Sequence, residues 1–149
     1  MPVETEAVGK RYDPVLYAVG REKIREYAAA VGETDPVHFD LEAARAAGYP
    51  DLVAPPMFAA VYSAPALGPA LLDPELGIDF TMMVHGGQEF VWGAPVVAGN
   101  EITTVARVKE IYARGAMGFY VFASESENQR GERVCAGTWT NIVREVGSL

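Results

Sequence analysis

The sequence predicts an α+β fold in which an antiparallel β-sheet packs against one apolar helix. Two observations carry this prediction. Residues 52–72 contain no charged side chain and are rich in alanine and proline, and segments rich in Val, Ile, Thr and aromatic residues fill the chain from about residue 82 onward. No linker or internal repeat divides the 149 residues, a length ordinary for one domain. We therefore expect a single domain over residues 1–149.

The first half of the chain has the pattern of helices joined by short loops. Residues 17–19 are a candidate short strand, and residues 21–31 are an expected helix that Gly32 ends. A second, short helix is expected over residues 41–47, between the N-cap Asp40 and Gly48. A third is expected over residues 57–66, begun by Pro56 and ended before Pro69.

Four strands are expected in the second half, at about residues 82–92, 101–112, 117–126 and 133–144. The turns between them are short, so neighbouring strands should be antiparallel. A helix without charges needs apolar cover on every side, and a sheet that curls around the helix provides this cover. The arrangement is a hot-dog fold, and we expect the other face of its sheet to meet a partner subunit.

The composition excludes several classes of function. Twelve Lys and Arg against twenty Asp and Glu leave a net charge of −8, which disfavours binding to nucleic acid or to an anionic membrane. The single cysteine, Cys135, excludes an intramolecular disulfide and a cysteine-based zinc site, and we expect no metal. The first thirteen residues lack the apolar core of a signal peptide, so we expect a cytoplasmic protein. Residues 52–72 are long enough to cross a membrane, but four prolines interrupt them, which favours a covered helix.

Glu33 and His38 are the candidate catalytic residues. They lie five residues apart in a loop that Pro36 stiffens, so their side chains can converge. A carboxylate and an imidazole together can hold one water or one substrate hydroxyl, with the imidazole exchanging a proton at carbon and the carboxylate acting at oxygen. Adding water to a double bond, or removing it, requires such a pair. A structural role stays open, in which the carboxylates of this loop cap a turn and His38 is a hydrogen-bonded loop histidine.

In these residues the chain resembles the MaoC-like, or R-specific enoyl hydratase, family, and the resemblance covers nearly the whole sequence. The family motif is roughly Gly-Asp-x-Asn-Pro-x-His. Gly32, Pro36 and His38 match it here, Glu33 stands in place of the aspartate, and Asp35 replaces the asparagine. The resemblance implies a (3R)-hydroxyacyl-thioester dehydratase or trans-2-enoyl-thioester hydratase that needs no cofactor beyond the coenzyme A or phosphopantetheine carrying its substrate.

A second motif narrows the resemblance. Residues 54–57 read Ala-Pro-Pro-Met where the family usually has Ala-His-Gly-Met at the start of the central helix. This version is most similar to the N-terminal MaoC-like subgroup, which includes the A and C subunits of mycobacterial hydroxyacyl-carrier-protein dehydratases. The resemblance implies a homodimer, or a heterodimer with another MaoC-like subunit. The substrate-binding candidates are Asp35, Pro56, Met57, His85 and Gly86.

Two departures from the family pattern leave alternatives open. Glu33 reaches about 1.5 Å farther than an aspartate would. Pro56 has no N–H to donate where the family has glycine, so the amide of Met57 would have to serve. In the subgroup the catalytic pair is often lost, so the alternative function is a non-catalytic acyl-binding partner that shapes the substrate tunnel. A hot-dog thioesterase is disfavoured because residues 57–67 contain no Asp or Glu. The Gly86–Gly87 pair beside His85 either approaches a ligand or marks a β-bulge.

Overall fold

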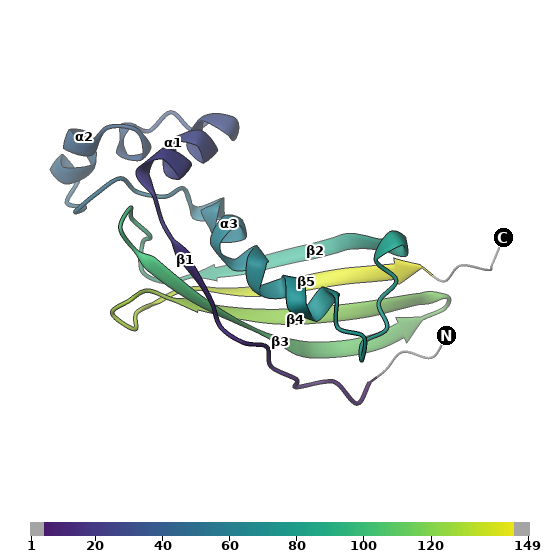
Figure 1. Cartoon of the computed structure of the whole chain (residues 1–149). Helices are drawn as coiled ribbons and strands as arrows, with labels where there is room; N and C mark the ends of the chain where they lie inside the picture. The colour runs from purple at the N-terminus through teal and green to yellow at the C-terminus, as the bar shows by residue number, and fades with distance from the viewer. Residues whose placement is uncertain (1–4, 145–149) are drawn as a thin grey trace.

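The fold is an antiparallel five-stranded sheet with helices on one side, as the computed structural model of residues 5–144 shows (Figure 1). The predicted hot-dog class is therefore confirmed. The strand order is β1-β3-β4-β5-β2, so the short first strand and β2 form the two edges of the sheet. The strands are β1 Val15–Ala18, β2 Met83–Trp92, β3 Glu101–Arg114, β4 Met117–Glu127 and β5 Arg133–Arg144.

The first strand lies slightly earlier in the sequence than predicted. It covers Val15–Ala18 and pairs with β3 through Val15 and Thr104 at one end and Ala18 and Glu101 at the other. Val19 is outside the strand but its N–H still donates to the carbonyl of Asn100, over 2.9 Å. The chain then turns directly into the first helix.

The other regular elements of the described residues are short helices and 3-10 turns (labelled η), joined by loops. The first two predicted helices are present, each one residue shorter at its C-terminus than expected. Gly32 and Gly48 follow them with φ angles of 76° and 95°, which glycine adopts most easily. These elements are α1 Arg21–Ala30, η1 Pro36–His38 and α2 Leu41–Ala46, and η4 Phe80–Met82 precedes β2.

The central helical segment is longer than predicted. We expected it to end at residue 66, but it continues to Leu71. Pro65 and Pro69 each stand in the first two positions of a new helical turn, where a missing N–H breaks no intrahelical hydrogen bond. The prolines therefore divide the central segment into shorter turns instead of ending it. These are η2 Pro56–Phe58, α3 Ala59–Ser63, η3 Ala64–Leu67 and α4 Gly68–Leu71.

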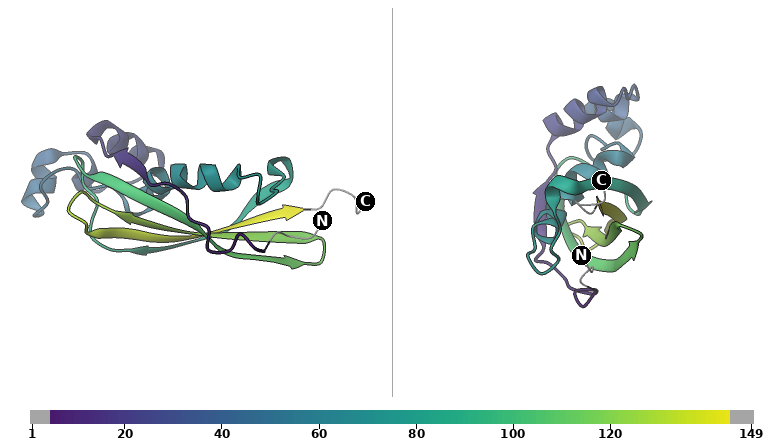
Figure 2. Two further views of the ribbon diagram at one scale, coloured as in Figure 1. Left: turned by 60° about the horizontal axis from the view of Figure 1, so that its bottom comes forward. Right: turned by 90° about the vertical axis from the view of Figure 1, so that its right-hand side faces the viewer.

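The central segment runs along one face of the curved sheet, while α1 and α2 lie beyond one end of it (Figures 1 and 2). Ala59, Ala66 and Ala70 are fully buried, because their small side chains let the helix approach the strands closely. Other residues of the segment are open to solvent: Met57 is 47% exposed, and Pro65 and Pro69 are exposed as well. The expectation of cover on every side is thus wrong for a single chain, since the sheet encloses the helix only partly. Among the described residues no helix is both long and apolar enough to span a membrane.

Two apolar clusters hold the central segment on the sheet. In the first, the fully buried ring of Phe58 contacts the rings of Tyr17, Tyr27 and Tyr62 at centroid distances of 6.1, 5.4 and 6.2 Å. The second cluster joins η3 and α4 to β3 and β4 and includes Phe122, which is also fully buried. The first cluster matters for function because it fixes the start of the central segment beside the loop that carries Glu33 and His38.

Candidate active site

The loop after α1 is built to hold His38 in one orientation. Asp35 begins η1, and its carboxylate accepts the N–H of Val37 at 3.1 Å. The carbonyl of Val37 in turn accepts the N–H of Val53 at 3.0 Å, which ties the loop to the segment leading into the central helix. Val53 also forms an isolated bridge to Val97, before β3. The loop is therefore braced against the body of the fold.

The imidazole of His38 is buried, at 7% exposed, and its hydrogen bond identifies its tautomer. Its Nδ1 lies 2.6 Å from the carbonyl oxygen of Val53. A carbonyl can only accept, so Nδ1 carries the hydrogen and the Nε2 of the neutral ring has a free lone pair. This Nε2 lies 3.9 Å from a carboxylate oxygen of Glu33, whose side chain is 39% exposed. The gap exceeds a direct hydrogen bond but suits a shared water or substrate oxygen.

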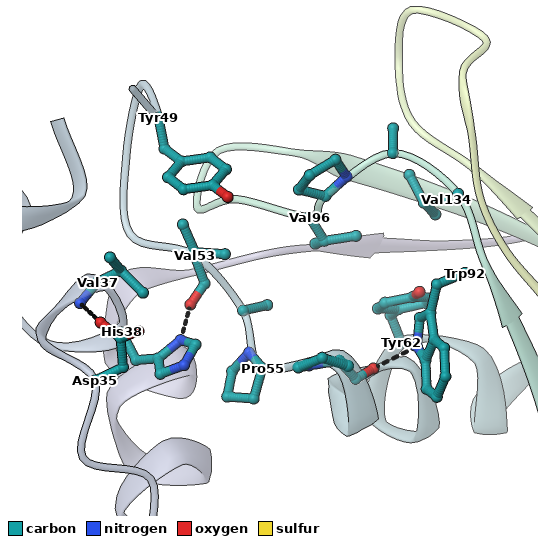
Figure 3. Close-up of a pocket in the computed structure, with 15 residues that line it drawn as sticks. Asp35, Val37, His38, Tyr49, Val53, Pro55, Tyr62, Trp92, Val96 and Val134 are labelled. Carbon is teal, nitrogen blue, oxygen red and sulfur yellow. Dashed lines mark hydrogen bonds between the residues drawn. The ribbon is translucent and has the colours of Figure 1, made fainter. Parts of the chain in front are cut away.

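His38 faces a cavity of about 560 Å³, within the usual range for small-molecule sites (Figure 3). Most of its walls are apolar. Trp92 closes one side, where its indole N–H donates to the carbonyl of Pro56 at 2.9 Å and so links β2 to the start of the central segment. The lining residues are Asp35, Val37, His38, Tyr49, Val53, Ala54, Pro55, Pro56, Tyr62, Trp92, Gly93, Ala94, Pro95, Val96 and Val134.

Four of the candidate residues lie together. His38, Asp35 and Pro56 line the cavity, and Glu33 stands beside His38. The Asp35 carboxylate accepts the N–H of Val37 and so caps η1. It has this structural role whether or not it also binds substrate. Met57 is absent from the cavity wall and is partly exposed to solvent.

The remaining two candidates lie elsewhere on β2. His85 is exposed, pairs with Asn141 of β5, and has its ring 6.2 Å from that of Trp139. The register shifts between His85 and Gly87, which confirms the β-bulge interpretation of the glycine pair. A Cβ on Gly86 would lie 2.5 Å from the terminal Cδ1 of Ile142, so that side chain occupies the space that glycine leaves open. Neither His85 nor Gly86 reaches the cavity, whose wall takes only the far end of β2.

Tyr49 and Tyr62 are cavity residues that the sequence did not single out. Tyr62 is one turn after Phe58 on the central segment, and its position within an uncharged helix was the available signal. Burial raises the pKa of Tyr62 far above its ordinary value, and its hydroxyl donates to the sulfur of Cys135. Burial also raises the pKa of the Cys135 thiol. Both groups therefore stay neutral near pH 7: Tyr62 forms part of the cavity wall, and Cys135 is a buried thiol that is not poised as a nucleophile.

An ion pair between Arg21 and Asp51 holds the chain segment next to Tyr49 in place. Arg21, at the start of α1, binds both carboxylate oxygens of Asp51, over 2.9 and 2.8 Å. The hydrogen bond from Arg21 lowers the pKa of Asp51, which stays ionised at neutral pH. This two-point contact holds the segment between α2 and the central helix against α1. It thereby sets the position of Tyr49, two residues before Asp51.

The fold is that of a hot-dog protein, and the comparisons with known proteins place it among those of the dehydratase type. The chain belongs to the MaoC-like dehydratases, because the profile of the family described as "FAS1-like, dehydratase domain region" matches residues 6–136. It is 43% identical over 145 residues to a UPF0336 protein of Saccharopolyspora erythraea, covering 97% of this chain and 93% of that one. A UPF0336 protein of Streptomyces coelicolor is 39% identical over 144 residues, with 96% and 95% coverage.

Solved structures agree with this assignment. The C-terminally truncated HadBC (3R-hydroxyacyl-ACP dehydratase) complex of Mycobacterium tuberculosis contains a chain with a TM-score of 0.78 and 30% identity. That comparison covers 94% of this chain and 99% of the other. A MaoC-like dehydratase superposes with a TM-score of 0.84 at 28% identity, covering 94% of this chain but 43% of that one. The chain therefore spans less than half the length of this second protein.

Proposed function

We propose that this chain is a hydro-lyase subunit that interconverts a (3R)-hydroxyacyl thioester and the trans-2-enoyl thioester. The observation that carries the proposal is the orientation of His38. Its Nδ1–H is held by Val53, and its free Nε2 lies at an apolar cavity with the Glu33 carboxylate 3.9 Å away. The family of dehydratases to which the chain belongs supports this type of reaction.

The pair accounts for every proton in the reaction. In dehydration, Nε2 of neutral His38 takes the proton from the carbon next to the thioester carbonyl. The C–O bond at the next carbon breaks, and protonated Glu33 gives its proton to the departing hydroxide, which leaves as water. The electron pair of the broken C–H bond forms the double bond. The site then holds an imidazolium and a carboxylate, which is the protonation state from which hydration starts.

The cavity supports an acyl thioester as substrate. Its wall is formed mostly by Val, Ala and Pro side chains with three aromatic residues, Tyr49, Tyr62 and Trp92, which suits a hydrocarbon chain. His38 and Glu33 supply the polar groups for the reacting carbons. We propose that the substrate arrives on coenzyme A or on phosphopantetheine and that no other cofactor takes part.

We also propose that the chain works as a dimer, with a second copy or with another MaoC-like subunit. HadBC and ChsH1–ChsH2 of Mycobacterium tuberculosis are complexes of related hot-dog chains. In this chain β2 pairs with β5 and leaves its other edge free, with Val84 45% and Val91 57% exposed on the strand. An unpaired edge with exposed apolar side chains favours association.

A non-catalytic partner subunit is the second candidate, and two observations favour it. The 3.9 Å between Glu33 and His38 leaves the pair without a direct hydrogen bond. Pro55 and Pro56 remove two amide donors from the start of the central segment, beside the cavity. In this alternative the cavity holds the acyl chain while a catalytic mate supplies the reacting groups.

Hydration of short and medium trans-2-enoyl-CoA by the purified chain tests the proposal, with loss of the enoyl absorbance as the signal. Replacing His38 with Ala should lower the rate at least ~100-fold, and Glu33→Gln should do likewise. His85→Ala is the matched control, because it removes the other histidine, which lies outside the cavity, and should change the rate less than about twofold.

The same assay gives a different result if the chain is a non-catalytic partner subunit. A folded chain inactive alone and active only with a catalytic MaoC-like mate would show that a heteromer is required. Equal activity of that complex with wild-type and His38→Ala chains would establish the non-catalytic role and contradict the proposed one.

A further inference from the structure

The proposed reaction also requires a hydrogen-bond donor for the thioester carbonyl oxygen, and neither Glu33 nor His38 supplies it. When the carbon beside the thioester carbonyl loses its proton, negative charge moves onto the carbonyl oxygen. Enzymes stabilise such an oxyanion with fixed hydrogen-bond donors, and one donor commonly contributes a hundredfold or more to the rate. The cavity must therefore present a free N–H or O–H near His38.

The backbone around the cavity offers few such donors. Pro55, Pro56 and Pro95 have no N–H at all. The neighbouring wall amides already donate within the chain, at 2.9–3.0 Å, and these are Val53 to Val37, Ala54 to Val96, Gly93 to Val134 and Ala94 to Arg133.

Most side-chain donors of the cavity are also occupied. The Nδ1–H of His38 donates to Val53, and the indole N–H of Trp92 donates to Pro56. The hydroxyl of Tyr62 is bound to Cys135. Within the described part of the chain, the hydroxyl of Tyr49 is the one side-chain donor of the cavity wall that has no partner.

The chain is held in place both before and after Tyr49. Its own N–H donates to the carbonyl of Ala44 at 3.0 Å, Gly48 before it takes a φ of 95°, and Asp51 after it is held by Arg21. The half-buried ring lies beside Val53, with its hydroxyl directed toward the space that the lining residues surround, and Val53 lies between it and the imidazole of His38 (Figure 3). A hydroxyl held in this way needs little reorganisation to meet a substrate oxygen.

We propose that the Tyr49 hydroxyl donates a hydrogen bond to the thioester carbonyl oxygen of the substrate. This rests on the proposed function and adds a third residue to it. His38 exchanges the proton at carbon, Glu33 acts at the hydroxyl oxygen, and Tyr49 stabilises the charge on the carbonyl oxygen. Pro55 and Pro56 have no backbone N–H to donate at the start of the central segment. The Tyr49 side chain, from the segment after α2, supplies a hydrogen-bond donor instead.

Tyr49→Phe tests the role with the loss of one oxygen atom. We expect kcat for enoyl-CoA hydration to fall at least ~30-fold with KM changed less than about threefold, because the bond strengthens in the transition state. Tyr112→Phe is the matched control: it removes the hydroxyl of a tyrosine in β3 that lies outside the cavity wall and stacks on Phe119, and kcat should change less than about threefold. Equal melting temperatures of Tyr49→Phe and the wild type exclude a folding defect.

A spectroscopic readout separates this proposal from the proposed function. Trans-cinnamoyl-CoA, bound by a His38→Ala chain that cannot turn it over, should show a red-shifted absorption because a donor polarises its carbonyl. Adding Tyr49→Phe should abolish the shift while binding persists.

The outcomes are distinct. An unchanged kcat and an unchanged red shift in Tyr49→Phe would overturn the role of Tyr49 and point to a backbone donor such as the amide of Val96. Where the chain is inactive alone, the red shift decides by itself. A wild-type chain that neither turns over enoyl-CoA nor binds cinnamoyl-CoA would overturn the proposed function, and this role with it.

Discussion

Gly93 is the position where the structure makes its sharpest stability prediction. It follows β2 in the cavity wall, and its N–H donates to the carbonyl of Val134 at 2.9 Å. A Cβ at this residue would lie 2.2 Å from the carbonyl oxygen of Arg133 and 3.0 Å from the carbonyl carbon. Both atoms are backbone, so no side chain can move aside. Gly93→Ala must therefore separate the end of β2 from the start of β5.

The cost follows from two contributions. The carbonyl of Arg133 also accepts the N–H of Ala94, at 2.9 Å, and the added methyl would displace that bond, at about 0.5–1.5 kcal/mol. Overpacking adds about 1–3 kcal/mol. We expect Gly93→Ala to lower the free energy of unfolding by about 2–4 kcal/mol, which is a fall in melting temperature of roughly 5–15 °C for a chain of this size.

Thermal and urea unfolding followed by circular dichroism would measure this change. Gly68→Ala is the control, because Gly68 has helical φ and ψ of −52° and −53° and its Cβ would meet nothing within 4 Å. It should leave the stability unchanged or raise it by about 0.5–1 kcal/mol. A melting temperature for Gly93→Ala within about 2 °C of the wild type would refute the close approach of β2 and β5.

Two further predictions concern other parts of the fold. Phe58→Ala should lower the free energy of unfolding by about 3–5 kcal/mol because the ring is fully buried among three tyrosines, and a urea titration would detect it. Asp73 accepts hydrogen bonds from Lys10 at 2.7 Å and Tyr12 at 2.7 Å, which lower its pKa. A carboxyl with a lowered pKa stabilises the fold above its ordinary titration range, and the contribution is lost progressively as the pH falls from that range through the lowered pKa. Asp73→Asn should thus be less stable than the wild type at neutral pH, and urea titrations at decreasing pH should show the difference shrinking; a difference that grows in acid would contradict the sign.

Part of the site followed from local sequence. Glu33 and His38 are close in the chain, and Pro36 together with the Asp35 cap restricts the loop between them, so their proximity needed no tertiary information. The glycine pair after His85 likewise indicated the β-bulge that the strand register shows. The end of the central helix was misjudged because a proline ends a helix in its interior but is tolerated at the start of a turn, and Pro69 occupies the second kind of position.

By itself, the sequence determined the class of fold, the strands, the short helices and the pairing of Glu33 with His38. These features depend on side-chain periodicity, capping and short loops, whose interactions span only a few residues. Only the tertiary structure decided that Val53 orients His38, that Tyr49 and Tyr62 line the cavity, and that His85 lies outside it. The cavity wall joins segments from residue 35 to residue 134. Which side chains meet there depends on how the central segment packs on the sheet, and no local pattern encodes that packing.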